Sequence, residues 1–378
     1  MKTMALLYQY DIKCTSFDYD FHQGIQFLHP TIPSDVRSAF KKYKKHHNRK
    51  YKGEEHEMRK NIFKDNWEFI NDHNSKNLGY VLEVNEFADK RYNELRYLTG
   101  IRSFDEVPIK SRKGHNGPIK AHNNSHKSIK AHKRSGGPPI RDRDGSNGPI
   151  KGSPYTEEEL PENFDLRMLG VISPVQNQAH CGSCWAFAAA ATLEGAIAHS
   201  NGGRILDFSE QALVDCAWDY DCEGCQGTLS IGSVFEYVKA HGIPTVDEYG
   251  PYLEEDGYCK VGNMSHLQKI KSAEEVTPND EEALKTAIYK YGPVALGVHV
   301  SQAMIFYKSG IFYDPECPVG GINHAVSAIG YGYKDGELFW VIKNSWGESW
   351  GSDGYLYITA KNDNCNVMMT PYYVIVTD

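Results

Sequence analysis

The sequence predicts an α+β protein with two lobes that both contribute to one cleft. Two observations support this fold class. Helical patterns occupy the earlier part of the chain and strand patterns the later part, which is the order typical of α+β folds. Of the 378 residues, 40% are hydrophobic and 24% are charged, so the chain can bury a sizeable core and is not a disordered protein.

The N-terminal part divides into an extension and a helical region. Residues 1–34 are rich in aromatic side chains and match no fold pattern; one hypothesis is that this extension is the remnant of a longer leader. Residues 35–75 are predicted to be helical, because Ile62, Phe63, Phe69 and Ile70 recur at helical spacing. The pattern predicts an amphipathic helix that packs on another surface.

Residues 107–158 are predicted to be a basic, low-complexity linker. Residues 107–156 hold 11 Lys and Arg against 2 Asp, and the tetrapeptide Gly-Pro-Ile-Lys occurs twice. This composition is typical of a flexible, solvated segment that proteases can reach. Its His residues could bind a metal, but low-complexity filler is the favoured interpretation.

Residues 159–378 are predicted to form one globular domain. Helices are expected at residues 183–199, 209–214 and 231–240, and the first of them is rich in Ala. Strand patterns follow at residues 294–300, 324–331, 338–343 and 354–359.

Charge and cysteine are unevenly distributed. Residues 1–159 hold 29 Lys and Arg against 21 Asp and Glu, a net charge of +8, whereas residues 160–378 hold 12 against 28, a net charge of −16. Opposite charges favour docking of the two parts, and the acidic part argues against nucleic acid as a partner. The sequence contains no run of 18 apolar residues, so it predicts no membrane-spanning helix. Eight of the nine cysteines lie in the acidic part, which indicates several disulfides and an oxidising compartment.

The densest candidate site contains Cys181-Gly182-Ser183-Cys184. A C-x-x-C pair can be a redox site or half of a zinc site. No βαβ unit surrounds the motif, and the second pair, Cys222 and Cys225, begins 38 residues after Cys184, which is wider than the usual zinc spacing. We therefore expect neither a metal nor another cofactor.

The other interpretation of this motif is a catalytic nucleophile. Cys-Gly-Ser-Cys-Trp is a signature of papain-like proteases, in which His and Asn follow about 130–150 residues downstream. His324 lies 140 residues after Cys184, and Asn344 follows 20 residues later within Asn-Ser-Trp-Gly. On these motifs the sequence resembles the papain family, of the cathepsin L kind, over residues 35–100 and 160–378. The resemblance implies a papain-like two-lobed fold with a helical left lobe and a β-barrel-like right lobe.

The resemblance implies a role for each matched residue. Cys184 would be the nucleophile at a helix N-terminus, and His324 would be its proton partner in a thiolate–imidazolium pair. Asn344 would orient the His324 ring, and Trp346 would shield that hydrogen bond from water. The side chain of Gln178 and the backbone N–H of Cys184 would stabilise the tetrahedral oxyanion. Peptide hydrolysis through a thioester is expected.

Disulfide pairing is also implied by the resemblance. The expected pairs are Cys181–Cys225, Cys216–Cys259 and Cys317–Cys365. Cys222 and Cys14 are then left over, and we expect Cys222 to be unpaired rather than bridged to Cys14. Asn123 and Asn263 begin glycosylation sequons, which would suit a glycoprotein.

Residues 35–106 resemble the inhibitory propeptide of the same family. The long-helix signature is matched by Glu55, Arg59, Phe63, Asn66, Ile70 and Asn74. The second signature, Asn85-x-Phe87-x-Asp89, departs from the family where Glu83 replaces the usual Gly. The resemblance implies a zymogen whose propeptide crosses the cleft backwards as an intramolecular inhibitor and is released by acid. The extended N-terminus and the linker resemble those of long-leader cathepsin L-like proteases of invertebrates, used in digestion or defence.

Substrate specificity is inferred from the same resemblance. The substrate-binding positions would be Gly227, Thr228, Leu229, Ser230, Gly297, Ile322, Asn323, Ala325, Trp346 and Thr370. Thr228 stands where the family usually has Gly, so a side chain could crowd the substrate there. The mostly apolar pocket predicts a hydrophobic residue at the second position before the cut, and the lack of an occluding insertion favours an endopeptidase.

The leading hypothesis is a monomeric cysteine endopeptidase made as a zymogen, located in the lysosome or outside the cell. Its expected partners are protein or peptide substrates and cystatin-type inhibitors. The alternative is a catalytically silent relative that binds or stores other molecules. The intact set of Cys184, His324, Asn344 and Gln178 argues against that alternative.

Overall fold

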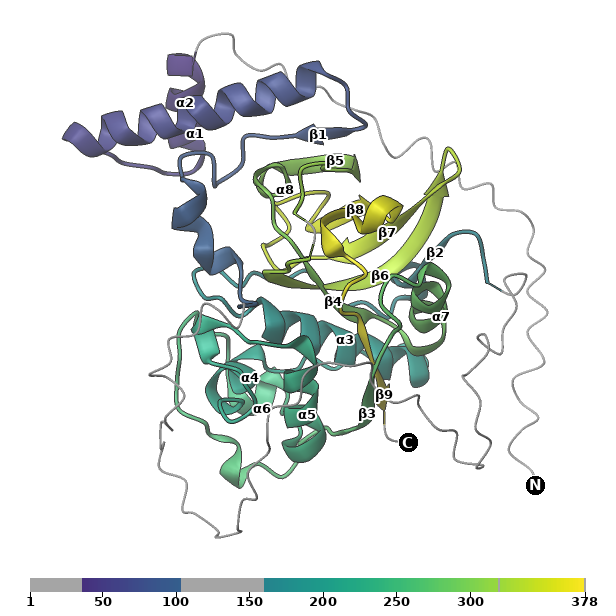
Figure 1. Ribbon diagram of the computed structural model, residues 1–378. Helices are drawn as coiled ribbons and strands as arrows, with labels where there is room; N and C mark the ends of the chain where they lie inside the picture. Colours follow the sequence, from purple (N-terminus) through teal and green to yellow (C-terminus); the bar gives the residue numbers. More distant parts are fainter. Residues whose placement is uncertain (1–35, 103–159, 319, 377–378) are drawn as a thin grey trace, which may run out of the picture.

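The side chains of the protein pack into two hydrophobic cores. The structure, a computed structural model, describes residues 36–102, 160–318 and 320–376 (Figure 1). One core lies among the strands and extends into the N-terminal helical segment. The other surrounds three helices, α3, α4 and α5. The helices are α1 (Val36–His46), α2 (Gly53–Ser75), α3 (Cys184–Ser200), α4 (Glu210–Cys216), α5 (Ile231–His241), α6 (Val246–Tyr249), α7 (Glu281–Tyr291) and α8 (Gln302–Ile305).

Helix α3 runs through the middle of the molecule (Figure 1), and most of its buried side chains belong to the second core. Every residue from Cys184 to Ala198 is buried, and the many Ala side chains let neighbouring backbone approach closely. At Gly195 a Cβ atom would lie 2.3 Å from Pro293, so a larger side chain would not fit there. Because α3 is buried on all sides, packing fixes the position of the helix and of its first residue, Cys184.

The strands form one path in the order β1-β5-β8-β7-β6-β4-β9-β3, and β2 pairs with β6. The strands are β1 (Tyr80–Leu82), β2 (Phe164–Asp165), β3 (Ile270–Glu275), β4 (Val294–Val298), β5 (Tyr307–Phe312), β6 (His324–Lys334), β7 (Glu337–Lys343), β8 (Tyr355–Thr359) and β9 (Tyr372–Val376). The expected barrel-like lobe is instead an open sheet, because its two end strands, β1 and β3, do not pair with each other in the described part of the chain.

The described part of the predicted propeptide, residues 36–102, is called the prosegment below. It covers the strand-containing lobe and then runs to the junction of the two lobes (Figure 1). Phe63 and Ile70 of α2 are fully buried, as the helical periodicity predicts, and Phe63 packs against Phe40 and Tyr43 of α1. The side chain of Asn74 donates to the carbonyl oxygen of Leu82 and accepts from its N–H, which fixes β1 beside α2. After β1 the chain forms a short 3-10 helix, η1 (Tyr92–Leu98), and reaches the cleft.

The predicted elements of the catalytic domain are present with small shifts at their ends. The extension over residues 1–34 and the linker over residues 107–158 lie outside the described residues. Within the described part, no helix has both the length and the apolar character needed to cross a membrane.

Candidate active site

The residues predicted to act together come from both lobes. Cys184 is the first residue of α3, His324 is the first residue of β6, and Asn344 directly follows β7. All three side chains are buried. Because β6 and β7 are adjacent antiparallel strands, the chain brings His324 and Asn344 to the same end of the sheet.

The imidazole of His324 is held on two sides. Its Nε2 atom lies 2.8 Å from Oδ1 of Asn344, and that oxygen also accepts from the N–H of Ser345 at 2.8 Å. The ring of Trp346 lies with its centroid 4.8 Å from that of His324. The next backbone N–H, that of Ala325, donates to Sγ of Cys184 at 3.3 Å. The other ring nitrogen, Nδ1, is buried without a hydrogen-bond partner among the described residues.

Burial sets the charge state of this pair. It raises the pKa of the Cys184 thiol to about 12, partly offset by backbone N–H groups of Ala325, Trp185 and Gly100. It also lowers the pKa of His324 to about 4, opposed by the hydrogen bond to Asn344. While the prosegment covers the site, burial therefore favours a neutral thiol and a neutral imidazole, and the ion pair expected from the sequence stays a prediction for the uncovered enzyme.

Gln178 is oriented by a residue that the sequence analysis missed. Its Oε1 accepts from the Ser345 hydroxyl at 2.7 Å, and its Nε2 donates to the carbonyl oxygens of Cys181 at 3.0 Å and Tyr97 at 2.9 Å. Ser345 lies within the Asn-Ser-Trp-Gly motif, which was the available signal. The amide expected to stabilise an oxyanion thus already binds a carbonyl oxygen of the prosegment.

The prosegment crosses the site as an extended strand. The N–H groups of Gly100 and Ile101 both donate to the carbonyl oxygen of Asn323, at 3.0 and 2.9 Å. On the other side, Thr228 N–H donates to Gly100 O at 2.7 Å, and Arg102 N–H donates to Thr228 O at 2.9 Å. Ile101 and Thr228 form a parallel bridge.

The covering is tightest at Gly100. A Cβ atom on Gly100 would lie 3.0 Å from Sγ of Cys184 and 2.0 Å from the carbonyl oxygen of Gly182. Two residues earlier, at the end of η1, the carbonyl oxygen of Leu98 accepts from the indole N–H of Trp346 at 3.2 Å. The segment from Leu98 to Gly100 therefore shields the thiol from solvent.

Thr228 does not crowd the cleft as its replacement of Gly suggested. Its hydroxyl lies 3.2 Å from the carbonyl oxygen of Asp221 and 3.0 Å from that of Ser230, within its own loop, while its backbone pairs with the prosegment. Gly227 does need to be Gly, because its φ is +99° and a Cβ atom would lie 2.3 Å from Gly100 O.

The other predicted substrate-binding residues lie around the prosegment strand. A Cβ atom on Gly297 would lie 2.4 Å from Ile322 and 3.1 Å from Oγ1 of Thr370, so these three residues are neighbours. Ile322 and Ala325 belong to the same hydrophobic cluster as Ile101. The two remaining positions are half-buried before α5, and they are Leu229 and Ser230.

The structure joins six cysteines in the three expected pairs, Cys181–Cys225, Cys216–Cys259 and Cys317–Cys365. Cys181 is therefore not paired with Cys184, which leaves no redox pair in the C-x-x-C motif. The free cysteines of the described segments are Cys184 and Cys222, both buried. Cys14, Asn123 and the side chain of Asn263 lie outside the described residues.

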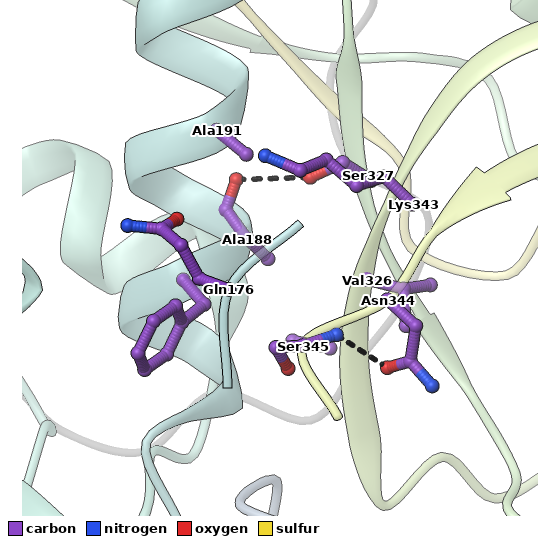
Figure 2. Close-up of a pocket in the computed structure, with 10 residues that line it drawn as sticks. Gln176, Ala188, Ala191, Val326, Ser327, Lys343, Asn344 and Ser345 are labelled. Atoms are coloured by element: carbon purple, nitrogen blue, oxygen red, sulfur yellow. Dashed lines mark hydrogen bonds between the residues drawn. The ribbon is translucent and has the colours of Figure 1, made fainter. Parts of the chain in front are cut away.

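A small cavity lies behind Asn344, between α3 and strands β6 and β7 (Figure 2). Ser327 donates across it to the carbonyl oxygen of Ala188 at 3.1 Å. Its other lining residues include Gln176, Ala191, Val326, Lys343 and Ser345.

A buried ionic network beside this cavity connects the lobes, and the sequence analysis did not find it. Lys343 of β7 donates to the Ser173 hydroxyl at 2.8 Å, and Ser173 donates to Glu194 of α3 at 2.5 Å. Burial lowers the pKa of Lys343 and raises that of Glu194. The nearby carboxyl of Glu210 is also buried, which together with the charge of Glu194 raises its pKa to about 8.

Comparisons with known proteins agree with this geometry. The family model described as papain family cysteine protease matches residues 160–375, and the cathepsin propeptide inhibitor domain matches residues 40–95. Pro-cathepsin H of Mus musculus is 32% identical over 350 residues, covering 91% of this chain and 92% of that protein. Procathepsin L of Rattus norvegicus is 30% identical over 366 residues, covering 93% and 96%. The solved structure of digestive procathepsin L2 from Tenebrio molitor larval midgut superposes with a TM-score of 0.72 at 29% identity, covering 90% of this chain and all of that one. The chain therefore belongs to the papain family of cysteine proteases and is a zymogen that carries its own propeptide.

Proposed function

We propose that this zymogen releases a cysteine endopeptidase in which Cys184 is the nucleophile and His324 transfers the proton. The observation that carries the proposal is the arrangement around one peptide segment. The prosegment backbone lies against Sγ of Cys184, and the amide of Gln178 donates to the carbonyl oxygen of Tyr97 in that segment. A substrate backbone in the same cleft would meet the same groups.

Removal of the prosegment would change the charge state of the pair. Solvent would then reach Cys184 and His324, which removes the burial that keeps both neutral. The N-terminus of the 17-residue helix α3 favours the thiolate, and the thiolate favours the imidazolium. Asn344 holds the imidazole through its 2.8 Å contact with Nε2, which leaves Nδ1, unpartnered among the described residues, as the nitrogen that would exchange the proton.

The reaction then proceeds in two halves. The thiolate forms a bond to the carbonyl carbon, and the resulting oxyanion accepts from the side chain of Gln178 and the backbone N–H of Cys184. The imidazolium of His324 protonates the leaving amine as the C–N bond breaks, which leaves a thioester. Water, deprotonated by the neutral imidazole, attacks this thioester, and its cleavage yields the carboxylic acid and restores the thiolate.

The contacts of the prosegment also support the substrate preference. Ile101 is buried in the same cluster as Ile322 and Ala325, so an apolar side chain suits the second position before the cut. The prosegment crosses the cleft in extended form from Thr99 to Arg102, and a substrate can extend in both directions in the same way. This favours an endopeptidase.

The disulfides bear on the compartment. Three disulfides in one domain are typical of proteins in oxidising compartments, and we propose that this enzyme acts in the lysosome or outside the cell. We also propose that the released enzyme is a monomer and that cystatin-type inhibitors bind it.

The experiment compares the two free, buried cysteines as matched variants. Zymogen is activated at acidic pH and assayed with a peptide that has a hydrophobic second residue, and the enzyme is titrated with a thiol-directed peptide epoxide. Cys184→Ala should abolish both cleavage and epoxide labelling, whereas Cys222→Ala should retain both. Cleavage that survives in Cys184→Ala would refute the assignment of the nucleophile.

A further inference from the structure

An ion pair joins the prosegment to the loop between α4 and α5. Nη1 of Arg102 lies 3.0 Å from Oε2 of Glu223, and the two side chains are 19% and 33% exposed. Glu223 lies on the loop between α4 and α5, next to the backbone that pairs with the prosegment. Because the pair is partly shielded from water, the interaction is stronger than that of a fully exposed pair.

The extended part of the prosegment shows how many residues of a bound peptide separate Glu223 from the sulfur of Cys184. Gly100 lies against Sγ of Cys184, Ile101 is opposite Thr228, and Arg102 follows with its side chain on Glu223. Successive residues of any extended peptide advance by about 3.3 Å along this edge, whichever way the chain runs. Counting outward from the sulfur, Glu223 therefore faces the third residue.

Glu223 is held in place by its own loop. Its N–H donates to Gly227 O at 2.7 Å. The Thr228 hydroxyl lies 3.2 Å from Asp221 O and 3.5 Å from Sγ of Cys222, so the side chain of Thr228 contacts the two residues that precede Glu223. A Gly at position 228 would make neither contact, so the side chain of Thr228 stabilises the conformation of this loop.

The charge around Glu223 is also suited to a cation. The catalytic domain has a net charge of −16 over residues 160–378, and Asp221 lies on the same loop, two residues before Glu223. A cationic side chain at this point is attracted by Glu223 directly and by the field of the domain.

We propose that Glu223 is a specificity-determining residue that selects Arg or Lys at the third position before the cut. The proposal rests on the proposed endopeptidase activity, and it adds a charge preference to the hydrophobic preference at the second position. In the zymogen, Arg102 occupies the place of that substrate side chain.

The test uses fluorogenic peptides that differ only at the third residue before the cut, which is Arg, its uncharged isostere citrulline, or Glu. The activated enzyme is compared with Glu223→Gln, with the charge reversal Glu223→Lys, and with Asp219→Asn as a control. Asp219→Asn removes the same charge from the same loop at an exposed residue. Active-site titration normalises kcat/KM for each preparation.

The wild-type enzyme should cleave the Arg peptide about fivefold faster than the citrulline peptide, as expected for a partly exposed ion pair. Glu223→Gln should lose this preference, Glu223→Lys should prefer the Glu peptide, and Asp219→Asn should behave as wild type. Equal cleavage of the Arg and citrulline peptides by the wild-type enzyme would overturn this proposal alone. A preference that persists in Glu223→Gln would do the same. Failure of every variant to cleave any peptide would overturn the proposed function as well.

Discussion

Substitution of Gly100 by Ala should expose the buried thiol of the zymogen. The added methyl group would lie 2.0 Å from the carbonyl oxygen of Gly182, which cannot move freely because its N–H donates to Cys225 O and its neighbour Cys181 is bonded to Cys225. The φ of Gly100 lies outside the left-handed region, so the variant introduces a clash and no other backbone strain.

The size of the effect follows from the hydrogen bonds that Gly100 makes. Its N–H donates to Asn323 O, and its carbonyl oxygen accepts from Thr228 N–H. Each such bond contributes about 1 kcal/mol, so their loss weakens docking of the prosegment by about 2 kcal/mol. A change of that size corresponds to a roughly 30-fold larger population of open zymogen.

The assay is the rate at which iodoacetamide alkylates Cys184 in the intact zymogen at a pH where it does not process itself. Peptide mapping separates Cys184 from Cys222, which serves as the internal reference. Thr99→Ala is the matched control, because the Thr99 hydroxyl donates only to Arg96 O within the prosegment itself. Alkylation of Cys184 that is no faster in Gly100→Ala than in the wild type would refute the reasoning. An equal rise at Cys222 would also refute it, since that would indicate general unfolding.

Three further predictions concern the network, the histidine and the pH dependence. Lys343→Met should lower the free energy of unfolding in urea by about 3 kcal/mol because Glu194 loses its buried cation, whereas Lys361→Met at an exposed pair should lower it much less; equal losses would contradict the network. Asn344→Ala should lower kcat of the activated enzyme at least about tenfold, with little change in KM, because the imidazole loses its orienting contact; an unchanged kcat would argue against that role. Although burial opposes it, hydrogen bonds from the backbone N–H of Arg91 and the side chain of Arg59 lower the pKa of Glu94 below its usual 4.5, so the prosegment is most stable above pH 4.5 and loses this contribution as the pH falls through the lowered pKa; the activation rate should therefore rise below pH 4.5, and a flat profile there would rule out this linkage.

Elements with strong local patterns could be predicted from the sequence. The Ala-rich helix expected at residues 183–199 is α3, Cys184–Ser200, because an uninterrupted apolar run leaves little choice of conformation. Helix α7 was missed although Asp280 caps its N-terminus and Leu284, Ala287 and Ile288 are spaced as one helical face. That helix had a usable signal.

Other strands had no such signal. Strand β3 has the sequence Ile-Lys-Ser-Ala-Glu-Glu, which is not a strand pattern, and its partner is β9, about 100 residues later. Strand β5 contains Ser309 and Gly310 and pairs with β1 and, in parallel, with β8. Pairing with distant segments determines both strands, and a local pattern does not contain that information.

The candidate site shows the same division. The matched motifs predicted that Cys184, His324 and Asn344 share one site. They did not predict the hydrogen bond from Gln178 to Tyr97 O, which joins residues 81 positions apart. The link from Lys343 through Ser173 to Glu194 joins residues still farther apart in the sequence, and a buried Lys has no signature that separates it from an exposed one. Such contacts depend on tertiary packing, which fixes the burial and the charge states of the site.

The pairing of β1 with β5 has a consequence for the enzyme after maturation. In the zymogen, Tyr80–Leu82 occupies one side of Tyr307–Gly310, and Glu83 meets Lys308 at 3.1 Å. Once the prosegment leaves, the backbone N–H and C=O groups on that edge of β5 have no strand partner, and exposed edge strands of this kind pair with other extended chains or self-associate. Lys308 then lies on the exposed edge without Glu83, and its positive charge opposes edge-to-edge pairing of two enzyme molecules.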